Sequence, residues 1–200
     1  MPGNMTYKEW EQAFVKGGAK DDMEQLSLPL KKMQNGLEDD IMKLSDNELG
    51  AIIRYKSFDS YVINEALRNT DDITKLSNEQ QRFINLLDSA LSKVPKYKGD
   101  LLRTVDFSSW SDAEEKTRGF VESFVVGKIT HIPQYWSTTT GKVDVGNSEI
   151  QIYILGAKNG HDIRNIGLNE NEVLYERGSK FLVIDKYFAD DKWSILLREV

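Results

Sequence analysis

The apolar residues of this chain change their spacing near residue 98, and this change limits the folds that the chain can adopt. Up to Pro95, apolar residues recur every three or four positions, which is typical of amphipathic helices. From Gly99 onward, apolar and polar residues alternate, which is typical of half-buried strands. Helices followed by strands predict an α+β fold. We therefore expect one domain over residues 1–200, mainly helical over 1–98 and mainly β over 99–200.

The clearest of the expected helices covers residues 77–94, where Ser77 is placed to cap its first turn. An earlier helix is expected to begin at Ser45 or Asp46, with Glu48 in its first turn, and to continue to about residue 58. The other expected helices cover residues 6–20, 60–69 and 111–124.

The second half is expected to form a largely antiparallel pair of sheets. Ile150, Ile152 and Ile154 alternate strictly with their neighbours, as in a strand with one buried face. Turns are expected at Gly178 and at 189–191, so the last strands form a meander. The expected strands cover residues 99–107, 125–140, 147–158, 172–178, 179–188 and 192–200.

The composition of the chain and the motifs that it lacks exclude several classes of function. A net charge of −6 argues against nucleic acid as the main partner, since phosphate binding needs a clustered basic surface. The absence of cysteine excludes a disulfide framework and a thiolate metal site. His131 and His161 give no zinc-ligand spacing, and no glycine-rich phosphate loop is present. No signal peptide is visible, and no apolar run reaches the roughly 18 residues of a membrane helix. We expect no metal, no nucleic acid and no membrane insertion.

Three features of the predicted strands can carry chemistry. Arg103 lies among apolar residues of a predicted core strand, where its planar guanidinium suits a phosphate or a carboxylate. Residues 135–140, Tyr-Trp-Ser-Thr-Thr-Thr, place a row of hydroxyls at a strand end. Glu170 and Glu172 stand two apart before an apolar strand, so alternation sends both carboxylates to one face. Taken singly, each feature also has a structural explanation: a buried ion pair, an exposed strand edge, or a solvated pair of acids.

In combination, the order of these features resembles the Arg-Ser-Glu class of mono-ADP-ribosyltransferases. This class includes the enzymatic components of clostridial binary actin toxins, the Rho-modifying exoenzymes and related bacterial effectors. Residues 51–69 are similar to the family's helix pattern Tyr-Thr-x-x-x-Tyr-x-x-Ile-Asn-x-x-Leu-Arg. Residues 86–105 are similar to the lead into its NAD-binding arginine strand, and residues 158–183 to its loop, Glu-x-Glu and strand order. The resemblance covers roughly 45–200 and implies an ADP-ribosyltransferase-like fold, with N-terminal helices packed on a two-sheet, largely antiparallel β core.

The resemblance implies a division of labour among the catalytic residues. Family members split NAD+ at the nicotinamide–ribose bond through an oxocarbenium-like transition state, which a carboxylate stabilises. Glu172 would supply that carboxylate and hold the ribose 2′-hydroxyl, while Ser137 would orient Glu172. Glu170 would position an incoming guanidinium and accept its proton. In the family, a glutamate at this first position goes with arginine acceptors, and glutamine goes with asparagine.

The resemblance also assigns the contacts to NAD+. Arg103 would bind the pyrophosphate, and Asn64 and Arg68 would assist from a helix. The other expected contacts are Tyr55, Tyr61 and Thr138.

Some positions depart from the family pattern. Thr104 stands where glycine is frequent, and Thr139 stands where the family has serine. The loop that usually carries a nicotinamide-stacking aromatic is short here and contains no Phe or Tyr. The turn before Glu170 also lacks the aromatic that often contacts the target protein. The stacking group and the acceptor protein therefore stay unassigned.

We therefore expect an NAD+-dependent protein-arginine ADP-ribosyltransferase with side NAD+ glycohydrolase activity. It would be a bacterial toxin or effector, secreted or delivered into the cytosol of a target cell. Its target would be a host or competitor protein, with actin and small GTPases as the candidates that the resemblance offers. Two alternatives stay open: an NAD+ glycohydrolase without a protein acceptor, and a non-catalytic NAD- or protein-binding domain of the same fold.

Overall fold

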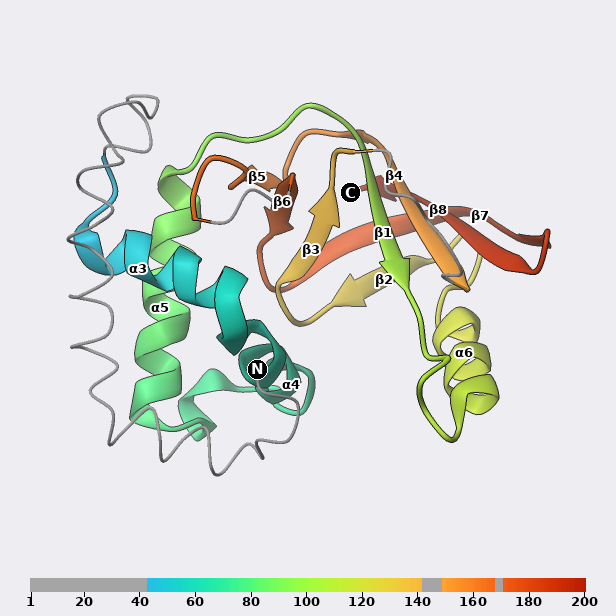
Figure 1. Cartoon of the computed structure of the whole chain (residues 1–200), viewed down its shortest axis with the longest axis horizontal. Coiled ribbons are helices and arrows are strands. Elements are labelled where there is room, and N and C mark those ends of the chain that lie inside the picture. The colour runs from blue at the N-terminus through green and yellow to red at the C-terminus, as the bar shows by residue number, and fades with distance from the viewer. Residues whose placement is uncertain (1–42, 142–148, 168–170) are drawn as a thin grey trace. The chain divides into compact units, whose positions relative to one another are not determined.

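A computed structural model describes residues 43–141, 149–167 and 171–200 (Figure 1). The helix expected at 6–20 lies outside these residues. The described residues fall into two compact units. The first contains those up to Pro95 together with 162–167, and the second contains those from Lys96 to His161 and from Asn171 onward. The chain therefore leaves the second unit once and returns to it.

Three α-helices of the first unit confirm the expected helices at 45–58, 60–69 and 77–94. They are α3 (Asp46–Arg54), α4 (Ser60–Arg68) and α5 (Asn78–Lys93). Ser45 and Ser77 cap α3 and α5 through reciprocal capping boxes, which satisfy backbone donors that a helix leaves open. A π-helical turn, η3 (Tyr55–Asp59), joins α3 to α4, and a short 3₁₀ turn, η4 (Ile73–Lys75), precedes α5.

Glu48 joins α3 to α5 within this unit. Its carboxylate accepts hydrogen bonds from Ser89 Oγ at 2.6 Å and from Lys93 Nζ at 2.8 and 2.9 Å. Burial alone would raise the pKa of Glu48, but the hydrogen bonds from Lys93, Ser89 and Ser45 outweigh it and lower the pKa to about 2. The two helices are thus held by a carboxylate that stays ionised at neutral pH.

Eight strands form one hydrogen-bonded order, β2-β7-β8-β4-β1-β3-β6-β5. The pair β4–β8 is parallel, and the pairs β1–β3, β1–β4, β2–β7, β3–β6 and β7–β8 are antiparallel. The largely antiparallel expectation is confirmed. The strands are β1 (Gly99–Val105), β2 (Ile129–Ile132), β3 (Trp136–Thr139), β4 (Ile150–Ala157), β5 (His161–Asp162), β6 (Glu172–Tyr175), β7 (Ser179–Ala189) and β8 (Lys192–Glu199).

The expected pair of sheets corresponds to two groups of strands within this order, β2-β7-β8-β4-β1 and β3-β6-β5. Their link is the β1–β3 pairing, which has a single registered pair, Leu102 with Thr139. The single strand expected at 125–140 is in fact β2 and β3, because Pro133 has no N–H to donate to a ladder. The helix expected at 111–124 is α6 (Ala113–Glu122). No helix among the described residues is long and apolar enough to span a membrane.

Candidate active site

The strand order brings three of the expected site residues onto neighbouring strands of the second unit. Arg103 lies on β1, Ser137 on β3 and Glu172 at the start of β6, and β3 stands between the other two strands. These residues are far apart in the sequence, so only the sheet topology places their strands side by side. Glu170 lies outside the described residues.

Arg103 connects β1 to β3 through its side chain. Its Nη1 donates a hydrogen bond to the backbone carbonyl of Ser137 at 2.8 Å. Its guanidinium carbon lies 5.6 Å from the ring centroid of Trp136, which is within cation–π range. Both contacts restrict the orientation of the guanidinium. In the register of β1 and β3, Leu102 pairs with Thr139, so Arg103 shares the face of Trp136 and Thr138 and not the face of Thr139.

The register of β3 and β6 determines which hydroxyl lies opposite Glu172. Thr139 pairs with Glu172, whereas Ser137 pairs with Leu174. Directly paired residues share a face of the sheet, and the next residue but one shares it too. Ser137 is therefore a diagonal neighbour of Glu172 on the same face, and Thr139 is its direct neighbour. Glu172 itself is only 6% exposed.

Thr138 points to the other face of β3. Its hydroxyl is buried and donates to the carbonyl of Val173 at 2.7 Å. This face belongs to the hydrophobic core, which includes Trp136, Val173 and Tyr175. The side chain of Thr138 thus lies away from the face that Ser137 and Glu172 share.

The four expected residues of the first unit lie on or next to α4. Tyr61, Asn64 and Arg68 are three and four positions apart, so they follow one face of the helix. Tyr61 is 67% exposed, and Arg68 is also exposed. Tyr55 is buried in the π-helical turn, and its hydroxyl accepts a hydrogen bond from Asn64 Nδ2 at 2.9 Å. Tyr55 thereby orients the Asn64 amide.

Comparison with known proteins decides the family. The model of the family described as ADP-ribosyltransferase exoenzyme matches residues 3–200. The chain belongs to this family. This chain is 27% identical over 160 residues to the NAD(+)--protein-arginine ADP-ribosyltransferase Tre1 of Pseudomonas putida (strain GB-1). That match covers 78% of this chain but only 30% of the relative, so this chain spans less than a third of that protein.

Two solved structures show that this chain has the ADP-ribosyltransferase fold. HopU1 of Pseudomonas syringae pv. Tomato DC3000 matches with a TM-score of 0.69 and 17% identity, over 90% of this chain and 87% of that one. C3stau2 from S. aureus, described with NAD, matches with a TM-score of 0.64 and 22% identity, over 86% and 95% of the two chains.

The sequence did not indicate how the chain holds the segment that leads to its Glu-x-Glu motif. Lys56 Nζ donates to the carbonyls of Ile163 and Ile166 at 3.1 and 2.9 Å. Arg164 forms a two-point ion pair with Asp162, at 2.8 and 2.7 Å. Burial acts to raise the pKa of Asp162, but the contacts with Arg164 and the charge of Lys56 lower it overall. The segment 162–167 is thus anchored within the first unit. The only signal of this anchoring in the sequence is the position of the segment just before the Glu-x-Glu motif.

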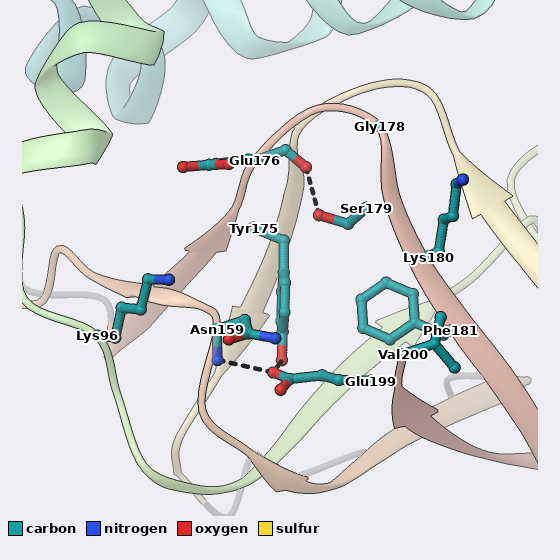
Figure 2. Close-up of a pocket in the computed structure, with 10 residues that line it drawn as sticks. All are labelled: Lys96, Asn159, Tyr175, Glu176, Gly178, Ser179, Lys180, Phe181, Glu199 and Val200. Carbon is teal, nitrogen blue, oxygen red and sulfur yellow. Dashed lines mark hydrogen bonds between the residues drawn. The ribbon is translucent and has the colours of Figure 1, made fainter.

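The strand that carries Glu172 is anchored at its other end, beside a pocket of about 290 Å³ (Figure 2). Tyr175 ends β6, and its hydroxyl donates to Glu199 Oε1 at 2.6 Å. Backbone N–H groups of Lys158 and Asn159 also donate to the Glu199 carboxylate. Burial, followed by the hydrogen bond to Glu199, raises the pKa of Tyr175. Because β6 and β8 are not neighbours in the sheet, this contact ties Glu172's strand to the far group of strands.

Among the described residues, no three His, Cys, Asp or Glu side chains are grouped so that they could hold a metal ion.

Proposed function

We propose that this chain is a catalytic unit that transfers ADP-ribose from NAD+ to an arginine of a target protein. One observation carries the proposal: the sheet places the strands of Arg103, Ser137 and Glu172 side by side, in a member of the ADP-ribosyltransferase exoenzyme family. The names of the curated relatives support arginine as the acceptor. A structural neighbour described with NAD supports NAD+ as the donor.

The reaction breaks the bond between ribose C1′ and the nicotinamide nitrogen. The bonding electron pair leaves with nicotinamide, which becomes neutral, and positive charge develops on the ribose. The buried carboxylate of Glu172 stabilises that charge more strongly than it stabilises neutral groups. A guanidinium nitrogen of the acceptor then bonds to C1′ and loses a proton, which Glu170 accepts.

The remaining site residues bind NAD+ or orient the side chains that contact it. Arg103 pairs with the pyrophosphate through its planar guanidinium. Ser137 orients Glu172 from the diagonal position. Asn64 and Arg68, with Tyr61, contact NAD+ from α4, and Tyr55 positions Asn64. We give Thr138 a structural role in place of the NAD+ contact expected from sequence, because its buried hydroxyl is bonded to Val173.

The test of this function is incubation with labelled NAD+ and lysates of candidate target cells, followed by mass spectrometry of the modified residue. We expect ADP-ribosylated arginine in the sample with the wild-type chain and roughly 10²–10³-fold less with Glu172→Gln. Release of nicotinamide without protein labelling would identify an NAD+ glycohydrolase instead. If the folded protein neither labels a protein nor releases nicotinamide, it is a non-catalytic domain. As a member of an exoenzyme family, the protein is proposed to act as a toxin or effector in the cytosol of a target cell.

A further inference from the structure

A groove of about 630 Å³ lies within the second unit, lined by α6 and by the hairpin of β7 and β8. One face of α6 forms its first wall, since lining residues Glu114, Thr117, Arg118 and Val121 recur at helical spacing. The second wall is the hairpin, where Phe188 and Trp193 are direct partners in the register and so share a face. Among the described residues, neither Ser137 nor Glu172 lines this groove.

Lys186 joins the hairpin to α6, and Thr117 joins α6 to the residue before β4. Lys186, on the groove side of β7, donates to the carbonyls of Val121 and Phe124 at 3.0 and 2.7 Å, at the end of α6. Thr117 donates its hydroxyl to Glu149 Oε2 at 2.8 Å. The groove is therefore formed before any partner binds, which lowers the entropy cost of binding.

The hairpin wall exposes aromatic surface to solvent. Phe188 is 56% exposed, and its ring lies 5.3 Å from that of Trp193 with an interplanar angle of 53°. Exposed aromatic side chains beside a formed groove are typical of a protein-binding surface. The faces of these rings also attract cationic groups.

The charged residues of the groove are mainly acidic. Four carboxylates line it, against Arg118 and Lys186, and the Lys186 ammonium is already bonded to two backbone carbonyls. The four carboxylates belong to Glu114, Glu122, Glu149 and Asp191. Carboxylates around aromatic rings complement a segment that carries Arg or Lys together with apolar residues.

We propose that this groove docks a basic, partly apolar segment of the acceptor protein, away from the arginine that is modified. The inference rests on the proposed function for the identity of the partner, because an arginine-directed transferase acts on a protein with cationic surface. The groove would select among acceptors by binding, while the chemistry stays with Glu172.

Binding is tested first, without NAD+, using a labelled 12-residue peptide of alternating Arg and Leu on the full chain. Two matched pairs of variants distinguish an effect of the groove from a general effect of charge or of lost aromatic surface. They are Glu114→Lys against Glu115→Lys, and Phe188→Ser against Tyr187→Ser. Each control residue is an exposed neighbour outside the groove lining. We expect Glu114→Lys and Phe188→Ser each to weaken binding about tenfold, as loss of an interface hot spot does, and the controls to change it less than about twofold. Equal weakening by Glu114→Lys and Glu115→Lys would overturn the proposal.

Transfer is tested second, comparing the same peptide with arginine methyl ester as acceptors. In the groove variants, KM for the peptide should rise while its kcat, the reaction with the small ester and NAD+ hydrolysis stay unchanged. The wild-type chain could label the ester while the groove variants bind the peptide as tightly as the control variants do. In that case the groove proposal fails and the proposed transferase function stands. If the peptide binds as expected but nothing is labelled, the proposed function fails instead. A wild-type dimer that Phe188→Ser dissociates would show that a second copy occupies the groove and would also overturn the proposal.

Discussion

Glu172 and Glu170 are two residues apart in sequence but should fail in different ways when their charge is removed. Glu172→Gln keeps size and hydrogen bonding but removes the charge that faces the oxocarbenium. NAD+ hydrolysis and protein transfer should therefore fall together, by roughly 10²–10³-fold if this carboxylate acts like one preorganised electrostatic group. Glu170→Gln should abolish transfer while hydrolysis largely persists. Both activities are measured for both variants, and equal loss of both at Glu170 would refute the division.

Arg103 should contribute both to the binding of NAD+ and to the position of β3, through its hydrogen bond to the Ser137 carbonyl. Arg103→Ala should weaken NAD+ binding by about 1.5–3 kcal/mol, because a doubly charged pyrophosphate loses a charged hydrogen-bonding partner. Arg103→Lys should recover little of this, since an ammonium lacks the planar fork that donates to Ser137 and lies over Trp136. Isothermal titration with NAD+ gives the affinities, and wild-type affinity in Arg103→Ala would remove Arg103 from the site.

The hydroxyls of β3 can be separated by their register positions. Ser137→Ala should lower kcat roughly tenfold with little change in NAD+ affinity, as loss of one hydrogen bond to a charged group would. Thr139→Val is the matched comparison, because Thr139 stands directly opposite Glu172. Steady-state kinetics on both variants reveal which hydroxyl orients the carboxylate. A larger loss at Thr139 would transfer the orienting role from the diagonal to the direct neighbour.

At the scale of the element, the contact of Glu48 with Lys93 predicts an acid-sensitive junction between α3 and α5. Folding lowers the pKa of Glu48 from 4.5 to about 2, so the stabilisation is full above about pH 4.5 and is lost as the pH falls toward 2. Glu48→Gln should reduce the free energy of unfolding by about 1–3 kcal/mol at pH 7 and by less at pH 3. Urea unfolding at both pH values measures this. Asp71→Asn, in an exposed pair with Lys75, should leave the midpoint unchanged.

The helices and most strands could be predicted from sequence because their signals are local. Ser45 and Ser77 with their capping partners mark helix starts, and the alternation at 150–154 marks β4. The π-helical turn at 55–59 could not be predicted, because an extra residue in a helical turn is stabilised by tertiary contacts such as those of Lys56. The split of β2 from β3 had a local signal in Pro133, which has no N–H to donate to a ladder.

The candidate site was predictable in its residue types but not in its geometry. Motif order indicated Arg103, Ser137 and Glu172. The register that places Thr139 opposite Glu172, and that points Thr138 into the core, depends on the pairing of β3 with β6. A shift of one residue in that pairing would reverse the faces, and no single-strand pattern specifies which register is adopted.

At the scale of the whole molecule, Lys56 joins parts of the chain that are 107 and 110 residues apart. Lys56→Met should leave the carbonyls of Ile163 and Ile166 without this donor. Amides of 162–167, including the Ile166 N–H that bonds to Ile163, should then exchange roughly tenfold faster, as loss of one or two hydrogen bonds predicts. Hydrogen exchange with mass spectrometry measures this, with Lys75→Met as an exposed control. Unchanged protection would show that the Arg164–Asp162 pair suffices.

The discontinuous path of the chain between its two units also governs the order in which they can be completed during synthesis. A ribosome releases the chain from its N-terminus, so α3, α4 and α5 emerge well before the segment 162–167 that belongs to their unit. The second unit waits in turn for β8, the central neighbour of both β4 and β7. Neither unit can close until most of these 200 residues have been made. A nascent or partly translocated chain would therefore remain open for longer than one built from two consecutive units, and would offer holdase chaperones and proteases more time to engage it.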